Sequence, residues 1–353
     1  MGHNKVQVIK MPQKHSPFQL PEMELVEKRL QEINTYDNPW LSEVTGYVLH
    51  HGGKRLRPLL VLLCSDIYGA ALKTRIDVAV AAELIHSASL VHDDIVDNSS
   101  LRRGQPSTNK RWGNPSAVLV GDFLFARAYA ILSNYPAVLG VMTEAIASMC
   151  LGELRQMYCH FDPETTPEEY VLTIVSKTAS LITASCESGA LISSMPAAEV
   201  KILIRFALHT GIAYQIADDI SDYVLEAVEA GKPQGSDIRN GVVTLPLMYL
   251  LVNPDTRQRV HNLLSQKQPL EPKMLRQELE HTKAIQKAAV VACQHLDRGI
   301  ELLNNFPPGP AVLLLEELAR QVQERCTALS QHASPAQQPS QPCQAPCPQS
   351  GPS

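Results

Sequence analysis

Two aspartate-rich segments carry residue types that could bind metal ions. Asp93-Asp94-Ile95-Val96-Asp97 and Asp218-Asp219-Ile220-Ser221-Asp222 repeat one pattern about 125 positions apart, each inside an apolar, helix-forming stretch. Residues four apart share a face of a helix, so each segment presents carboxylates in one direction. Two such faces repel each other unless a cation lies between them, and Mg²⁺ takes carboxylate oxygens together with substrate phosphates. The pattern predicts a site for about two to three Mg²⁺ ions, with these candidate ligands: Asp93, Asp94, Asp97, Asp218, Asp219 and Asp222.

Basic residues elsewhere in the chain indicate that the metal site also holds phosphate. They are Lys54 and Arg57 in the segment 52–58, Arg102 and Arg103 just after the first aspartate segment, Lys177 beside Thr178, and Lys232. Arginine binds phosphate oxygens in bidentate fashion and lysine acts as a point charge. Two carboxylate clusters with several separate cations can hold more than one highly charged group. The sequence therefore predicts a pair of diphosphate substrates.

Each of these features also has an interpretation in which the residues neither bind a ligand nor take part in catalysis. A single acidic pair four residues apart is usually a solvated helix face, but two copies beside apolar residues and matched to distant cations disfavour that reading. Lys54 to Arg57 could form a surface basic patch or the start of a helix before Pro58. His86 lies in an apolar run, where a histidine is more often a hydrogen-bonded core residue, but it precedes Asp93 by about two helical turns on nearly the same face.

Helical periodicity dominates the chain from about Leu20 to about Leu329. Apolar residues recur at three- and four-residue spacing in 78–91, 117–132, 138–149, 170–192, 200–217 and 311–326, and no run alternates as a strand would. Pro and Gly mark the breaks between these runs. The pattern predicts one all-α, multi-helix domain over 20–330. A flexible segment is expected at 1–19 and a disordered Pro/Gln/Ser-rich tail at 331–353.

Composition excludes several other classes of protein. The net charge of -5 disfavours a nucleic-acid partner. No uninterrupted apolar stretch reaches the length of a membrane span, so no transmembrane segment is expected. The first 14 residues lack the apolar core of a signal peptide, which predicts a cytoplasmic protein. The eight cysteines show no Cys-x-x-Cys pair, and Cys343 and Cys347 in the tail have no other metal ligands nearby.

The ordered set of motifs resembles the all-trans polyprenyl diphosphate synthases. In chain order the motifs are GGKRLRP, HSASLVHDDIVD, LRRG, GDFLFARA, KTASL, YQIADDISDY, GKPQGSDI and TLPL. The resemblance implies the helical isoprenoid synthase type I fold, a single-domain bundle of helices around a central cavity. It also implies that an allylic diphosphate ionises, that isopentenyl diphosphate attacks the allylic cation, and that proton loss gives a longer allylic diphosphate. The product of such a reaction partitions into membranes.

The same resemblance implies a role for each candidate residue. Asp93, Asp97 and Asp218 would hold Mg²⁺ against the leaving diphosphate, and Arg102, Lys177 and Lys232 would add positive charge to it. Thr178 and Gln215 would turn oxygen dipoles towards the carbocation. The residues implied for binding isopentenyl diphosphate are Lys54, Arg57, His86 and Arg103.

Two small residues near the first aspartate segment bear on product length. Ser89 lies one turn before Asp93, and Ala88 is its neighbour. Short-chain members of the family often carry bulky aromatics there, which floor the pocket. Small side chains predict a deep pocket and a long, hexaprenyl to octaprenyl product, with a deeper floor from a residue such as Phe123 or Phe125. Small residues are also compatible with simple close packing of helices.

The match to the family is incomplete at two positions. Val242 stands where the family often has a lysine before its Thr-Leu-Pro segment, and a valine supplies no charge to phosphate. Ser221 replaces an aliphatic residue inside the second aspartate segment. We expect Val242 to weaken one phosphate contact and Ser221 to have little effect.

Two other functions compete with chain elongation. A terpene cyclase shares the first aspartate segment but needs no isopentenyl-binding set and usually replaces the second segment. A non-catalytic or regulatory subunit of a heteromeric synthase is slightly favoured by Val242, but it has no need for six carboxylates near one cavity. The resemblance also implies a homodimer, with 117–132 as a candidate interface or equally a core helix, and it leaves open a small helper subunit.

Overall fold

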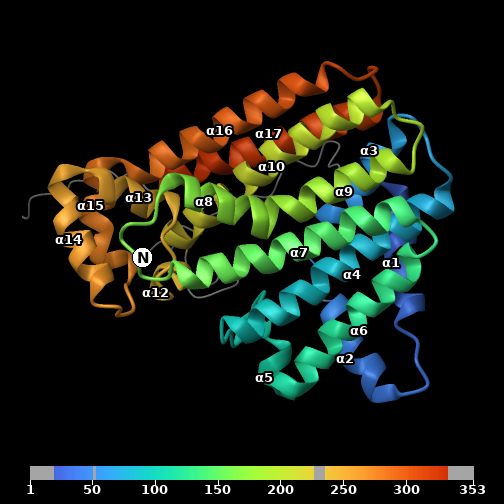
Figure 1. Ribbon diagram of the computed structural model, residues 1–353, viewed down its shortest axis with the longest axis horizontal. Helices are drawn as coiled ribbons and strands as arrows, with labels where there is room; N and C mark the ends of the chain where they lie inside the picture. Colours follow the sequence, from blue (N-terminus) through green and yellow to red (C-terminus); the bar gives the residue numbers. More distant parts are fainter. Residues whose placement is uncertain (1–19, 51–52, 226–234, 333–353) are drawn as a thin grey trace, which may run out of the picture.

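The molecule is built from long helices that run roughly along one direction (Figure 1). The computed structural model describes residues 20–50, 53–225 and 235–332. Within these ranges the strands are β1 (Leu101–Arg102) and β2 (Gln105–Pro106), which pair as one short hairpin. The predicted all-α class is therefore confirmed. The segment 1–19, most of the predicted tail with Cys343 and Cys347, and Lys232 lie outside the described residues.

The helices divide into a long set and a short set. The long helices are α4 (Leu72–Val96), α6 (Asn114–Leu132), α7 (Pro136–Tyr158), α10 (Ala197–Val224), α16 (Ala284–Leu303) and α17 (Pro310–His332). The shorter ones before α10 are α1 (Pro21–Ile33), α2 (Pro39–His50), α3 (Leu56–Asp66), α5 (Thr108–Trp112), α8 (Pro167–Ile174), the π-helix η2 (Val175–Ala179) and α9 (Ser180–Leu191). Those after α10 are α12 (Ser236–Arg239), α13 (Leu245–Val252), α14 (Pro254–Ser265), the 3₁₀-helix η3 (Pro272–Leu275) and α15 (Arg276–Thr282).

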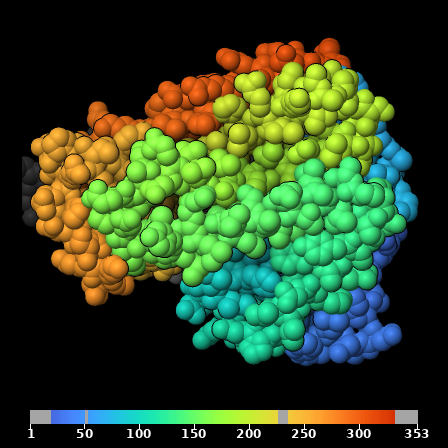
Figure 2. Space-filling view, in the orientation of Figure 1, coloured from blue at the N-terminus to red at the C-terminus, as the bar shows by residue number. Residues whose placement is uncertain are grey.

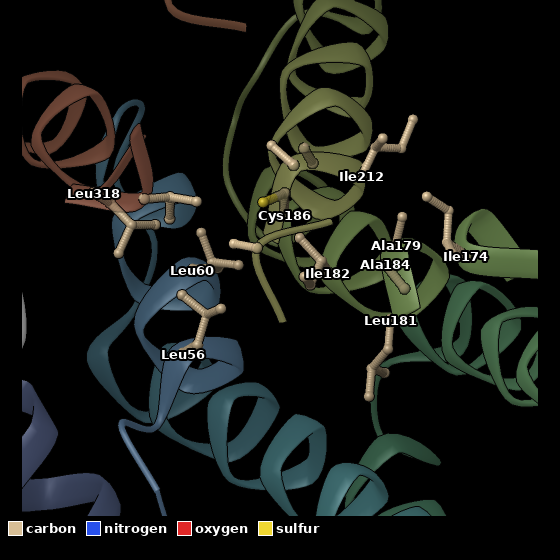
Figure 3. Packing of buried hydrophobic residues seen from close by; sticks show 14 of the residues in the cluster. Leu56, Leu60, Ile174, Ala179, Leu181, Ile182, Ala184, Cys186, Ile212 and Leu318 are labelled. Atoms are coloured by element: carbon tan, nitrogen blue, oxygen red, sulfur yellow. The ribbon is translucent and has the colours of Figure 1, made fainter. Parts of the chain in front are cut away.

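The core fixes the two helices that carry the aspartate segments. Leu56 and Leu60 of α3 face Ile182 and Cys186 of α9 across the interior, with Leu318 of α17 beside α3 (Figure 3). Burying an aliphatic side chain of this size contributes about 1.5–3 kcal/mol. Since α3 also packs on α4, and α9 packs on α10, this cluster sets the position of α4 relative to α10.

Helix boundaries follow the punctuation in the sequence. Proline occupies the first turn of α7 and of α17, where its missing N–H costs nothing. A capping box starts α8: Glu169 N–H donates to Thr166 Oγ1 at 3.2 Å, and Thr166 N–H donates to the Glu169 carboxylate at 2.8 Å. That cap fixes the entry to the segment that carries Lys177 and Thr178.

Two local structures differ from the sequence prediction, and both carry predicted phosphate-binding residues. The segment read without a strand forms the β1–β2 hairpin, whose turn holds Arg103 and Gly104 at φ 53° and 75°. Glycine adopts such a φ without a steric cost, which permits the tight turn. The stretch 170–192, predicted as continuous helix, contains the π-helix η2. A π-bulge inside a helix often marks a functional site because it widens the turn and redirects side chains.

Two helices, α6 and α7, are long and apolar enough to cross a membrane by length and composition. Neither helix is an uninterrupted apolar run, because each includes a few polar residues. Core helices of soluble proteins pass the same test, but here only 33% of the α6 window and 22% of the α7 window is buried inside the chain. In Figure 2 the teal and green surface of these helices lies across the front face.

Candidate active site

One cavity of about 1640 Å³ collects nearly all of the residues predicted to do chemistry. The predicted residues that line it are Lys54, Arg57, His86, Ser89, Asp93, Asp97, Arg102, Arg103, Lys177, Thr178, Gln215, Asp218 and Asp219. They come from α3, α4, the hairpin, η2 and α10, which the core holds together. Among the described candidates, Ala88, Asp94 and Asp222 are not part of this lining.

The first aspartate segment lies at the C-terminal end of α4. Asp93 is in the last turn and Asp97 is the C-cap residue, with its N–H donating to the Asp93 carbonyl at 2.8 Å. Carboxylates at this end of a helix face the negative end of the helix dipole. Burial, together with nearby Glu153 and Asp97, raises the pKa of Asp93 to about 6 against the pull of Lys177. Burial raises the pKa of Asp97 as well, so a cation between these side chains would relieve both.

Asp94 has a different partner from its neighbours. Its Oδ1 accepts N–H bonds from Arg102 Nε at 2.9 Å and from Arg102 Nη2, and it is only 3% exposed. The Asp94 carbonyl also accepts from the Asn109 amide at 3.2 Å. Asp94 therefore ties the hairpin to α4 and holds Arg102 at the cavity, instead of serving as the metal ligand that the sequence predicted.

In the second segment, Asp218 borders the cavity and Asp222 does not. Asp218 pairs with Arg325 of α17 at 2.8 Å. Asp222 is 1% exposed and accepts the backbone N–H groups of Ser236 and Asp237 at 3.1 and 3.0 Å. It thus caps the start of α12. The prediction that Asp218 and Asp222 present one metal-binding face differs from this geometry, because the chain after α10 returns to use Asp222 as a cap.

Asp219 anchors a hydrogen-bonded chain that ends at the cavity. Tyr170 Oη–H and Gln215 Nε2–H donate to the two Asp219 oxygens, each at 2.7 Å. Thr178 Oγ1–H donates in turn to Gln215 Oε1 at 2.6 Å. Burial, with Asp237 nearby, raises the pKa of Asp219 to about 7. Because the Thr178 proton is used by Gln215, the lone pairs of the Thr178 oxygen are left for the cavity.

The remaining aspartates fit a hard divalent cation. Asp93, Asp97 and Asp218 present oxygen ligands to the cavity from two helix ends. Within the described residues, no three His, Cys, Asp or Glu side chains gather closely enough to hold a metal by themselves. Mg²⁺ commonly binds through one or two carboxylates plus substrate phosphates and water. The donor set therefore suits a metal that a diphosphate helps to bind.

A second cluster of cations surrounds the start of α3. Arg55 is buried and donates to Glu83 at 2.6 Å, to Glu27 at 2.6 Å and to the Leu49 carbonyl at 2.6 Å. Arg55 borders the cavity together with Lys54 and Arg57, but its guanidinium is occupied by these protein acceptors. The structure separates the neighbouring basic residues of this motif into one internal brace and two candidate phosphate ligands.

His86 stands in this second cluster as a neutral imidazole. Burial first, and then Arg57 and Arg103, lower its pKa well below 6.5. Arg57 Nη1–H donates to His86 Nε2 at 3.1 Å, which requires that nitrogen to be unprotonated. The other ring nitrogen then carries the proton and can donate to a phosphate oxygen. The alternative of a purely structural core histidine fits less well, because His86 lines the cavity.

Lys177 is held at the mouth of the first aspartate cluster. Its Nζ lies 2.6 Å from Glu153 Oε2 of α7. Despite burial, the carboxylates of Glu153, Asp93 and Asp97 raise the pKa of Lys177, so it stays charged. Lys177 and Thr178 are adjacent in η2, yet one faces the carboxylates and the other faces Gln215.

Two residues that border the cavity, Arg325 and Glu153, were not predicted from the sequence. Arg325 comes from α17, more than a hundred positions after Asp218, and its guanidinium also lies 6.0 Å from the centre of the Tyr214 ring. Glu153 comes from α7 and lies opposite Lys177. No local spacing marks Arg325, since it sits in an ordinary amphipathic helix. The preceding Gly152 is the one feature of the local sequence that could have drawn attention to Glu153.

The apolar end of the cavity lies between α4, α6 and α7. Its walls include Ser89, Phe125, Ile146 and Met149. Ala88 has no exposed area and packs in the core, so the two small residues differ in position. Phe123 instead packs edge-to-face on Tyr36, with ring centres 5.1 Å apart. Of the two aromatics proposed as a deeper floor, Phe125 is the one that lines the cavity.

Comparison with known proteins gives a consistent set of matches. Residues 38–281 match the family model described as Polyprenyl synthetase. The chain is 36% identical over 309 residues to heptaprenyl diphosphate synthase component 2 of Bacillus subtilis, covering 86% of this chain and 88% of that protein. It is 34% identical over 241 residues to octaprenyl diphosphate synthase of Escherichia coli, covering 67% and 74%.

A solved structure shows the same arrangement of helices. The polyprenyl synthase of Caulobacter crescentus, complexed with calcium and isoprenyl diphosphate, aligns with a TM-score of 0.81 and 31% identity over 86% of this chain and 95% of that one. The family match includes both aspartate segments and the cations around α3, η2 and the hairpin, whereas Arg325 lies beyond it.

Proposed function

Because this chain belongs to the polyprenyl synthetase family, we propose that it condenses isopentenyl diphosphate with an allylic diphosphate and releases a long-chain polyprenyl diphosphate. It is a trans-prenyltransferase of isoprenoid biosynthesis. The observation that carries the proposal is one cavity lined by carboxylates of α4 and α10, with Arg102 and Lys177 beside them, and by the cations Lys54, Arg57 and Arg103.

The carboxylate end suits the allylic substrate. Family members use a divalent metal, and we propose two to three Mg²⁺ ions held by Asp93, Asp97 and Asp218 with the substrate's phosphates. Such ions, when bound, neutralise the charge that develops on a leaving diphosphate. Lys177 and Arg102 lie at the same end and would bind its remaining oxygens.

The chain's own groups then favour separation of an anion from a cation. As the allylic C–O bond breaks, the electron pair leaves with the diphosphate towards Lys177 and Arg102. The positive carbon is left beside the oxygen lone pairs of Thr178, which Gln215 and Asp219 hold in position through hydrogen bonds of 2.6 and 2.7 Å. Preorganised dipoles of this kind stabilise developing charge without reorganisation.

The cation end suits isopentenyl diphosphate. Lys54, Arg57 and Arg103 supply positive charge, and neutral His86 supplies an N–H. The double bond held there attacks the allylic cation and forms the new C–C bond. The released diphosphate, next to the new cation, then accepts the proton whose loss restores a double bond. The product is an allylic diphosphate and can react again.

The deciding experiment is a product assay. Purified chain is incubated with labelled isopentenyl diphosphate, farnesyl diphosphate and Mg²⁺, and the prenyl alcohols are resolved by length after dephosphorylation. A ladder that ends at a long product supports the proposal. A terpene cyclase would instead convert the allylic substrate without consuming isopentenyl diphosphate.

One observation favours a second candidate, a subunit of a heteromeric synthase. The Bacillus relative is named component 2 of its enzyme, and Val242 lines the cavity where the family often has a lysine. On this reading the chain binds diphosphate and metal but elongates only with a helper protein. An inactive purified chain that still binds pyrophosphate with Mg²⁺ would support this reading over a complete enzyme.

We further propose that α6 and α7 pack against a second copy of the chain. Leu119 on α6 is 68% exposed and Leu151 on α7 is 62% exposed, in helices whose apolar windows are mostly uncovered. The sequence-based candidate interface covered α6 only. A surface of this kind is unusual for a monomer and marks an interaction site.

A further inference from the structure

Two consecutive residues of α7, Gly152 and Glu153, contact Lys177 and hold it in place. A Cβ added at Gly152 would lie 2.7 Å from the Lys177 backbone nitrogen and 2.9 Å from Ser176 Cβ. Real side chains do not tolerate that approach, so a glycine is needed where η2 crosses α7. The next residue, Glu153, places its carboxylate 2.6 Å from the Lys177 ammonium. Gly152 thus allows the Lys177 backbone to approach α7, and Glu153 binds the Lys177 side chain.

The π-helix explains why Lys177 needs an acidic partner on α7. The wider turn of η2 directs Lys177 towards α4 and α7, and directs Thr178 towards Gln215 at 2.6 Å. A lysine side chain has four rotatable bonds and no fixed direction of its own. Without an acidic partner on α7, its ammonium could point at Asp93, at Asp97 or away from the cavity.

Glu153 is also a third carboxylate beside the first aspartate segment. It acts electrostatically on both Asp93 and Asp97, and it lines the cavity with them. It is 15% exposed, whereas Lys177 is 27% exposed, so water screens the pair only partly. A buried acidic group next to a diphosphate site would repel the substrate unless a cation stayed with it. Lys177 is that cation.

We propose that Glu153 is a positioning residue that acts through Lys177, holding its ammonium at the edge of the metal site so that it meets the allylic diphosphate. This inference rests on the proposed function, since Lys177 must bind the leaving diphosphate. It predicts that loss of Glu153 does not weaken binding further once Lys177 is removed, and relieves the repulsion of the unpaired carboxylate. The competing role is a direct metal ligand, for which the losses from the two residues would be independent.

A double-mutant cycle on binding separates these roles. Inorganic pyrophosphate is titrated into the protein with and without Mg²⁺ by calorimetry, for the wild type, Glu153→Gln, Lys177→Gln and the double variant. We expect each single change to weaken Mg²⁺-dependent pyrophosphate binding by about tenfold, and the double variant to bind no more weakly than Lys177→Gln alone. Losses that multiply to about a hundredfold would overturn the proposal, as would undiminished binding by either single variant.

Two further readouts distinguish positioning from support of the fold. If wild type elongates, Glu153→Gln should raise KM for the allylic diphosphate while KM for isopentenyl diphosphate stays unchanged; equal changes in both would contradict positioning. Thermal unfolding in EDTA should show the same non-additivity of the pair. Glu144→Gln, an exposed change on the same helix, is the matched control. Because pyrophosphate binding needs no elongation, loss of the proposed function and loss of this inference would give different results.

Discussion

Single aspartates in the two segments have opposite effects on the free energy of folding. Asp93 is a partly buried carboxylate at the negative end of α4 and costs energy in the metal-free protein. Asp222 is a fully hydrogen-bonded cap, and its oxygens satisfy two backbone N–H groups of α12. The same residue type in the same motif therefore stabilises the fold at Asp222, whereas at Asp93 it costs stability and suits the proposed metal site.

Replacing these two aspartates should separate activity from stability. Asp93→Asn should lower the elongation rate by at least about a hundredfold with the melting temperature kept or raised, because it removes charge from the metal site and from an unfavourable position. Asp222→Asn should lower the free energy of unfolding by about 2 kcal/mol, because a buried acceptor is lost. The measurements are initial rates at saturating Mg²⁺ and thermal unfolding. A stable but equally inactive Asp222→Asn would show that Asp222 takes part in metal binding.

A bulky residue at position 89 should shorten the product, whereas the same change at position 88 should mainly destabilise the fold. Ser89→Phe places an aromatic ring in the apolar end of the cavity and should shorten the main product by several isoprene units. Ala88 is packed in the core with no exposed area, so Ala88→Phe should destabilise the fold by about 1–3 kcal/mol or more instead. Product chromatography and thermal unfolding test the pair. An unchanged product ladder from soluble, folded Ser89→Phe would show that the hydrocarbon chain follows another wall.

The sequence predicted the residues of this site better than it predicted their partners. Spacing alone brought Asp93 and Asp97 to one helix end, because both lie in one regular element. The role of Asp222 could not be predicted from spacing, because its hydrogen-bond donors are backbone N–H groups of α12, more than ten residues later in the chain. Arg325 reaches Asp218 only through the packing of α17 on α10, and no local pattern encodes a contact between residues so far apart.

At the scale of elements, helix propensity was sufficient for the bundle but not for its irregular points. The stretch 170–192 has a continuous apolar pattern, yet the extra residue of η2 is set by contact with α7 at Gly152. The β1–β2 hairpin has two residues per strand, too short to produce an alternating pattern. Both irregular points place cations, which fits the tendency of functional sites to break local rules.

The interface between α10 and α16 should make stability depend on pH. His209 Nδ1 lies 2.9 Å from His295 Nδ1, so one ring donates and the other must stay unprotonated. Burial lowers the pKa of both rings; Arg298 and Arg205 lower that of His209 further, and His209 and Arg298 lower that of His295 further. Each histidine is therefore harder to protonate in the folded chain than at its ordinary value of 6.5. Their contribution to stability is complete above pH 6.5 and is lost as the pH falls towards the lowered values.

Replacing one ring should flatten that dependence. His209→Gln cannot be protonated, so the loss of melting temperature between pH 7.5 and 5.5 should be smaller than in the wild type. His332→Gln, at the exposed end of α17, provides the control and should leave the slope unchanged. The melting temperature is followed by circular dichroism across this range. Identical slopes for His209→Gln and wild type would show that other groups dominate the pH response.

For the whole molecule, the uncovered faces of α6 and α7 decide between a dimer and a membrane-bound monomer. Leu119, Leu151 and Leu313 are 68%, 62% and 65% exposed, but Leu313 is on α17, away from the proposed interface. A stable interface covers roughly 800 Å² on each partner, and a charge placed at its centre is poorly tolerated because it is buried without a partner. A charge on an open surface costs almost nothing.

Leu119→Glu and Leu151→Glu should therefore convert a dimer into monomers, whereas Leu313→Glu should leave its mass unchanged. The mass is measured by light scattering after size-exclusion chromatography at several protein concentrations. Elongation should fall in the two interface variants, because α7, which the interface would hold, also carries Glu153 and, through it, positions Lys177. A wild-type chain that is already monomeric, and that floats with anionic vesicles unless Leu151 is charged, would assign this face to a lipid surface instead.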